Sequence, residues 1–308
     1  KLKGGRIEGL ILDLRFNGGG SLLEAVAMAG IFIDAGPVGV VKTRDEEHTI
    51  KDLHRGIVYD GPLLVLVNGM SASASEFLAA ALQDHRRAII VGSKTYGKAT
   101  AQRLFPLDKS TSTVEVSGIK PGVGYASITV EKIYRINGRT AQQLGVTPHI
   151  LLPDVYDSLA FREDVQPRAF PNDSIARKTY YRPLQLLPIP ELRHRSEKRI
   201  SENAQFQTVR NFADYLARSQ NPGPLVLDAD SVFARASLEE AMLVDIENPG
   251  IPLPLFGINE SEYEAGRASV DVYLKDVNEA WKMKLSQDIY LNESFHIISD
   301  YIAILNRK

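Results

Sequence analysis

Residues 67–84 read VNGMSASASEFLAAALQD, in which an apolar strand runs into a cluster of small residues and then into an alanine-rich helix. This order places Ser73 at a helix N-terminus, where unpaired backbone N–H groups and the helix dipole favour a developing negative charge. Such N–H groups can form half of an oxyanion hole for acyl transfer. Ser73 and Glu76 also match the S-x-x-E capping box, so a plain N-cap is the alternative interpretation of Ser73.

The sequence around this stretch alternates apolar strands with helical segments. Strands are predicted at residues 9–14, 38–43, 62–67 and 87–91, and helices at 21–34 and 73–84. This alternation predicts right-handed crossovers around a largely parallel sheet. Residues 126–134 alternate with period two and precede the turn signal Asn137-Gly138, which predicts a long strand of a mixed sheet.

Composition excludes several classes of protein. The chain has 308 residues, is 44% hydrophobic and 24% charged, and carries a formal net charge of -2. It therefore lacks the basic field that binding to nucleic acid requires. The absence of Cys excludes disulfides and thiolate catalysis, and no apolar run approaches the roughly 18 residues of a membrane span. Because the chain starts at Lys1 without a signal peptide and soon enters a buried strand, we expect that an N-terminal part of a longer protein precedes it.

A serine nucleophile needs a base, and the histidines are poorly placed for this role. His85 is the nearest in sequence, but it would lie about 18 Å from Ser73 along the same helix, at about 1.5 Å per residue. A lysine can act as base if burial drives its pKa well below the usual value. Lys94 and Lys98 both lie among small residues after the strand at 87–91. Residue types and spacing alone leave the choice between them open.

Three separated blocks of sequence carry a resemblance to a known family. They are DLRFNGGG at residues 13–20, SASASE at 71–76 with ALQD at 81–84, and TYGK at 95–98 with Gln102. In this order and spacing they resemble the tail-specific, or carboxyl-terminal processing, serine proteases. That family has a Ser/Lys dyad and a crotonase-like (ClpP-like) fold. The resemblance is strong over about the first 175 residues.

The resemblance implies roles for individual residues. Ser73 would be the nucleophile and Lys98 the general base, in preference to Lys94, and Gln102 would orient the Lys98 amine. Ala99 departs from the family pattern, which usually has glycine after the lysine.

The resemblance also implies an oxyanion hole and one further acid. The N–H of Ala74 would act with an N–H from the glycine turn, Gly19 being preferred and Gly18 the alternative. Asp84 matches an acid implicated in the family's activity. It would lie about 16 Å from Ser73 along the helix axis, at about 1.5 Å per residue, so we expect a structural or indirect role for it.

At the level of the whole chain, the resemblance predicts an α/β fold. It comprises a truncated protease core with mixed sheet and flanking helices at residues 1–155 and a mainly helical domain at 156–308. The expected activity is endopeptidase cleavage of proteins with apolar carboxyl-terminal tails in the bacterial periplasm, with no metal or organic cofactor. The PDZ domain that normally precedes this core is not in the chain. The alternatives are a non-catalytic peptide- or ligand-binding module on the same fold, a crotonase-type acyl-CoA enzyme, and an inactive fragment of the protease.

Overall fold

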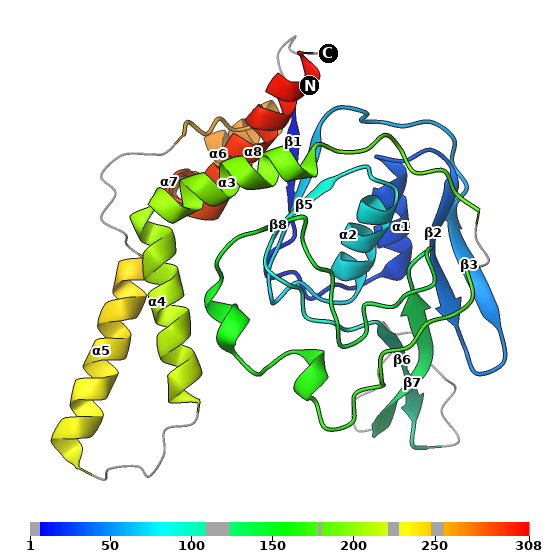
Figure 1. Cartoon of the computed structure of the whole chain (residues 1–308), viewed down its shortest axis with the longest axis horizontal. Helices are drawn as coiled ribbons and strands as arrows, with labels where there is room; N and C mark the ends of the chain where they lie inside the picture. Colours follow the sequence, from blue (N-terminus) through cyan, green and yellow to red (C-terminus); the bar gives the residue numbers. More distant parts are fainter. Residues whose placement is uncertain (1–6, 109–123, 178–179, 221–227, 248–255, 308) are drawn as a thin grey trace.

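The computed structural model describes residues 7–108, 124–177, 180–220, 228–247 and 256–307 (Figure 1). Within these ranges the first half of the chain forms two four-stranded sheets with two helices, and the second half is mainly helical. All strand pairs in one of these sheets are parallel, and all strand pairs in the other are antiparallel.

The parallel sheet has the strand order β1-β4-β5-β8. Its strands are β1 (Leu10–Asp13), β4 (Leu63–Val67), β5 (Ile89–Gly92) and β8 (Ile150–Leu151). In the central strand β4 every residue is buried, as expected when helices cover both faces of a parallel sheet. Its short apolar run therefore shows no alternation with polar residues.

The antiparallel sheet has the order β3-β2-β7-β6. Its strands are β2 (Gly36–Lys42), β3 (Glu47–Asp52), β6 (Thr100–Pro106) and β7 (Tyr125–Tyr134). A register shift between Ala101 and Gln102 interrupts the β6–β7 ladder, as a β-bulge does.

Helices α1 (Leu22–Gly30) and α2 (Ala74–Asp84) pack against one face of the parallel sheet and also contact the antiparallel sheet. Leu63, Val65 and Val67 of β4 belong to this core. The approach of α2 to β2 is close, since a Cβ on Gly39 would lie 2.2 Å from the Phe77 ring. Only glycine allows this contact.

The opposite face of the parallel sheet is covered by helices from the second half of the chain. Leu64 and Leu66 of β4 pack there with buried residues of α3 (Ile189–Glu202) and α8 (Ile289–Leu305), such as Leu192 and Ile297. Figure 1 shows α3 and α8 on this side and α1 and α2 on the other. The remaining helices are α4 (Ala204–Ser219), α5 (Ala229–Glu247), α6 (Glu262–Val270) and α7 (Val272–Ser286).

The fold class predicted from the sequence is confirmed: strands of both directions with flanking helices precede a mainly helical region. The strands predicted at 9–14, 62–67 and 87–91 are β1, β4 and β5. Strands β3, β6 and β8 were not predicted.

Candidate active site

Ser73 lies at the junction between β4 and α2. Its backbone has φ +57° and ψ −118°, a region that residues other than glycine rarely adopt and that is common at functional sites. The preceding turn is fixed by the Ser71 hydroxyl, which donates to the Leu14 carbonyl at 2.7 Å and accepts from the Asn68 N–H at 3.0 Å. Ser73 and Glu76 form the capping box that the sequence predicts, and the Ser73 N–H donates to Glu76 Oε2 at 2.9 Å. An N-cap residue typically has β-region backbone angles, so capping alone does not account for the positive φ of Ser73.

Glu76 is a buried carboxylate that joins the two motifs of the site. It is 1% exposed. Its Oε2 accepts from the backbone N–H groups of Ser73 and Lys98, each at 2.9 Å. Its Oε1 accepts from the Gly97 N–H at 2.7 Å and from the Thr95 hydroxyl. The start of α2 and the loop of Lys98 are thus bound to one side chain.

Burial dominates the protonation of Glu76. Desolvation raises the pKa of this carboxyl from 4.5 to about 7, although its hydrogen bonds to Thr95, Gly97, Ser73 and Lys98 act to lower it. From the sequence, Glu76 was recognised only as half of a capping box. The other three donors come from residues 19 to 22 positions away in the chain, and no local pattern signals them.

Lys98 lies in the loop between β5 and β6, and its side chain is partly buried. Gly97 before it has φ +96°, and a Cβ there would lie 3.0 Å from the backbone of Gln143. The competing lysine has different contacts: Lys94 is also partly buried, but its amine lies 3.8 Å from Asp164 and it does not line the pocket described below. No hydrogen bond or ion pair of the Lys98 amine is found within the described residues.

Ser73 and Lys98 line the same small pocket. The rest of its lining is mostly apolar and comes from the antiparallel sheet, α2 and adjoining loops, including Val38, Phe77, Ala80, Ala99, Ile133 and Ala141. The structure thus brings the two residues of the predicted dyad together in a mostly apolar setting.

The glycine turn lies directly against the start of α2. Gly19 has φ +93°, and a Cβ on it would lie 2.7 Å from the Ala74 nitrogen and 2.8 Å from the Ser73 Cβ. The Ala74 N–H, at the first position of α2, has no intrahelical partner. The Gly19 N–H donates to Asn17 Oδ1 at 3.0 Å, so it would have to leave this bond to serve as an oxyanion donor. A Cβ on Gly18 would meet nothing within 4 Å.

Asp84 lies at the opposite end of α2 from Ser73. Its two oxygens accept from Arg135 at 2.9 and 2.6 Å, and Oδ1 also accepts from Asn137 at 2.9 Å. The side chains of this ion pair are 7% exposed for Asp84 and 18% for Arg135. Arg135 also lines the Ser73 pocket, so Asp84 reaches the site only through another residue.

Gln102 is exposed on β6 and donates to the hydroxyls of Thr100 and Thr129 at 3.0 and 3.2 Å. It forms no hydrogen bond with Lys98 among the described residues. Its amide NH2 group is thus bound to these two threonines, beside the register shift of the β6–β7 ladder. Orientation of the lysine by Gln102 stays a prediction that requires a different side-chain position.

The nearby histidines have structural partners. His85 Nε2 contacts the Pro37 carbonyl at 2.8 Å, and His149 Nδ1 accepts from the Ile90 N–H at 3.0 Å. Burial, aided by Arg135 and Arg193, lowers the pKa of His149 to about 4. Neither lines the Ser73 pocket. Among the described residues no group of three His, Cys, Asp or Glu side chains could hold a metal ion.

Two family models match the chain. Residues 1–152 match the sequence model of Peptidase family S41, and residues 156–303 match that of the C-terminal domain of tail specific protease. The chain is 40% identical over 189 residues to the tail-specific protease of Haemophilus influenzae, covering 58% of the chain and 25% of that relative. It is 35% identical over 162 residues to the carboxy-terminal-processing protease of Bartonella bacilliformis, covering 51% of the chain and 34% of that relative.

Among solved structures, the photosystem II D1 C-terminal processing protease matches with 33% identity and a TM-score of 0.40, over 47% of the chain and 35% of that structure. The chain therefore spans between a quarter and about a third of the length of these relatives. In the part of the chain that the structure describes, no helix is long and apolar enough to cross a membrane.

Proposed function

We propose that this chain, whose residues 1–152 match the model of peptidase family S41, carries the catalytic centre of a tail-specific serine endopeptidase with Ser73 as nucleophile and Lys98 as general base. One observation carries the proposal. The side chains of Ser73 and Lys98 line one mostly apolar pocket, while their backbone N–H groups share the Glu76 carboxylate.

In the proposed reaction the neutral Lys98 amine takes the proton of the Ser73 hydroxyl as the oxygen attacks a peptide carbonyl. The Ala74 N–H and an N–H of the glycine turn, from Gly19 or Gly18, stabilise the oxyanion. Lys98 then protonates the leaving amine, and water hydrolyses the acyl-enzyme with Lys98 again as base. Gln102 and Asp84 would support the dyad indirectly.

The proposed substrates are proteins with apolar carboxyl-terminal tails. The small pocket beside Ser73 is lined mostly by aliphatic and aromatic side chains, which suits a small apolar side chain next to the cleaved bond. The named relatives from Haemophilus and Bartonella are bacterial, and we place the activity in the periplasm. Residues 1–155 would form the protease core and residues 156–308 an attached helical domain.

The test is cleavage of an unfolded protein that ends in small apolar residues, by a polypeptide that contains the whole chain. Ser73→Ala, Lys98→Ala and Lys98→Arg are expected to abolish cleavage, since a guanidinium does not lose its proton. Lys94→Ala is the matched control, because this lysine is in the same loop but does not line the Ser73 pocket, and this variant should cleave at the parental rate. Circular dichroism and thermal unfolding establish that all variants fold.

Parental cleavage by any folded Ser73 or Lys98 variant would overturn the assignment and favour a binding module on the same fold. A serine-directed fluorophosphonate separates the proposal from a crotonase-type acyl-CoA enzyme. It should label the parent at Ser73 and leave Ser73→Ala unlabelled, whereas an acyl-CoA enzyme would not react.

A further inference from the structure

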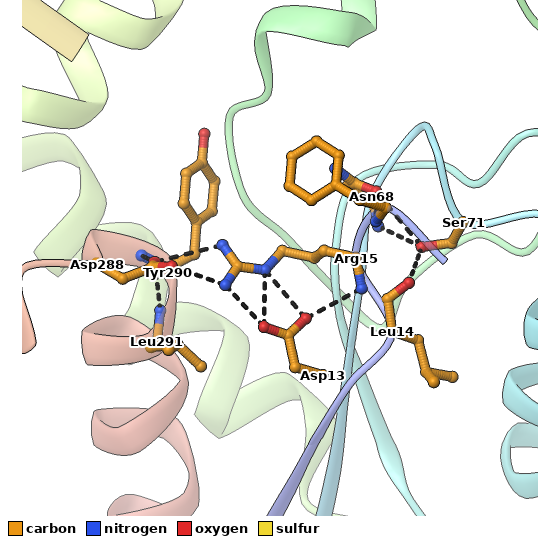
Figure 2. A network of polar contacts seen from close by, with 9 residues as sticks. Asp13, Leu14, Arg15, Asn68, Ser71, Asp288, Tyr290 and Leu291 are labelled. Atoms are coloured by element: carbon orange, nitrogen blue, oxygen red, sulfur yellow. Dashed lines mark hydrogen bonds and ion pairs between the residues drawn. The ribbon is translucent and has the colours of Figure 1, made fainter. Parts of the chain in front are cut away.

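A guanidinium group at the end of β1 links the catalytic core to the last helix of the chain (Figure 2). Arg15 Nη2 donates to Asp288 Oδ2 at 2.7 Å and to Asp13 Oδ2 at 2.7 Å, and Arg15 Nη1 donates to Asp288 Oδ1 at 3.3 Å. Its central carbon lies 5.5 Å from the centre of the Tyr290 ring. Arg15 is 11% exposed and Asp288 19%, so this ion pair is largely removed from solvent and more strongly coupled than a surface pair.

Asp288 is itself firmly placed. It is the N-cap of α8, and its Oδ1 accepts from the N–H groups of Tyr290 at 2.9 Å and Leu291 at 3.0 Å. The Tyr290 hydroxyl donates to the Pro153 carbonyl at 2.9 Å. Further along α8, Ile297 and Ile298 are buried against the parallel sheet. The carboxylate that binds Arg15 thus belongs to a rigid element.

On the other side, Arg15 leads directly into the glycine turn. Phe16 has φ +59°, unusual for a bulky residue, and its N–H donates to Asn68 Oδ1 at 3.0 Å. The Asn17 carbonyl accepts from the Ala72 N–H at 3.0 Å. Two residues later, Gly19 lies against Ser73. The position of the turn relative to the nucleophile is therefore set within four residues of Arg15.

We infer that Asp288 is a positioning residue for the glycine turn, so that the carboxyl-terminal helical region completes the active site through Arg15. The inference rests on the proposed role of Ser73 as nucleophile. It also assigns a task to α8, which contributes no side chain to the Ser73 pocket. Loss of the Asp288 carboxylate would leave the Arg15 guanidinium bound to Asp13 alone, through Nε at 3.1 Å to both carboxylate oxygens and through Nη2 at 2.7 Å. The end of β1 and the glycine turn could then shift relative to α8, and a shift of about 1 Å in a catalytic group can cost on the order of 100-fold in rate.

The test uses Asp288→Asn in a polypeptide that contains the whole chain. Asparagine is as good an N-cap as aspartate, so α8 keeps its cap while the charge is lost and an NH2 group can face Arg15. The matched control is Asp300→Asn. Asp300 is also on α8 and 19% exposed, and it pairs with Arg195 and Arg199 of α3, each at 2.8 Å.

Asp288→Asn is expected to lower kcat about 10- to 100-fold with KM nearly unchanged. The kcat of Asp300→Asn should stay within about twofold of the parent, because Asp300 binds α3 and not the glycine turn. A similar kcat for the two folded variants would overturn the inference. Should Asp288→Asn fail to fold, Asp288→Ser also keeps an N-cap and is expected to give the same loss.

Hydrogen exchange supplies a readout that does not depend on catalysis. In Asp288→Asn the amides of residues 15–20 should exchange faster than in the parent, and in Asp300→Asn they should not. Unchanged exchange in this segment would refute the positioning role even if the chain proves not to be a protease. Loss of the proposed function instead shows as parental cleavage in Ser73→Ala, so the two failures are distinguishable.

Discussion

Replacement of Glu76 by glutamine should change how stability depends on pH. The carboxylate accepts four hydrogen bonds, from Ser73, Thr95, Gly97 and Lys98. In its better orientation a glutamine accepts from Ser73 and Lys98 with its oxygen and turns its NH2 group toward Thr95 and Gly97. The Thr95 hydroxyl can rotate to accept from this NH2 group, but the Gly97 N–H remains a donor facing a donor. One buried donor is then unpaired, which costs about 1–3 kcal/mol.

The pKa of Glu76 determines the pH dependence. Because burial raises this pKa from 4.5 to about 7, the folded state binds more protons than the unfolded state between these values. The parent therefore loses stability as pH rises toward and through 7, and the loss between pH 5 and pH 8 is about 2–3 kcal/mol. Glu76→Gln has no such titration. The free-energy difference between parent and variant should thus be largest at pH 5 and shrink toward pH 8.

Urea unfolding of both proteins at pH 5, 6, 7 and 8 measures this difference directly. Glu24→Gln is the control, since its exposed side chain in the first turn of α1 should leave the pH profile parallel to that of the parent. A difference between parent and Glu76→Gln that is constant from pH 5 to pH 8 would refute the reasoning, because it would mean that Glu76 is ionised across the whole range.

Two further substitutions test the geometry of the site. Gly19→Ala should abolish cleavage and lower the free energy of unfolding by about 1–3 kcal/mol, because its Cβ would lie 2.6–2.8 Å from Ala72 O, Ala74 N and Ser73 Cβ at φ +93°. The control Gly18→Ala should be tolerated, since a Cβ there would meet nothing within 4 Å. Equal cleavage rates for the two variants would contradict the packing described. Asp84→Asn should lower the free energy of unfolding by about 2–4 kcal/mol by breaking the Arg135 pair, while fluorophosphonate labelling of Ser73 stays near the parental rate; a fully stable but unlabelled variant would show that Asp84 acts directly.

The sequence predicted the elements that consist mostly of apolar or small residues and are therefore buried along nearly their whole length. The run at 62–67 and the alanine-rich helix at 73–84 bury their side chains almost entirely, so hydrophobicity alone identified them. Strand β6 was missed because it contains the exposed polar pair Gln102 and Arg103 and is held by its ladder with β7. The parallel and antiparallel strands also lie in separate sheets, a division that pairing partners decide and local patterns do not.

By itself, the sequence determined that Ser73 lies at a strand-to-helix junction, an inference that rests on local features, namely the small residues and the helix start. The preference for Lys98 over Lys94 came from the resemblance of residues 95–98 to the protease family, because residue types and spacing left that choice open. Only the tertiary structure revealed that Glu76 binds both loops and that Arg15 pairs with Asp288, 273 positions away. Contacts between such distant residues depend on how the helices pack on the sheet, and packing leaves no periodic signal in the chain.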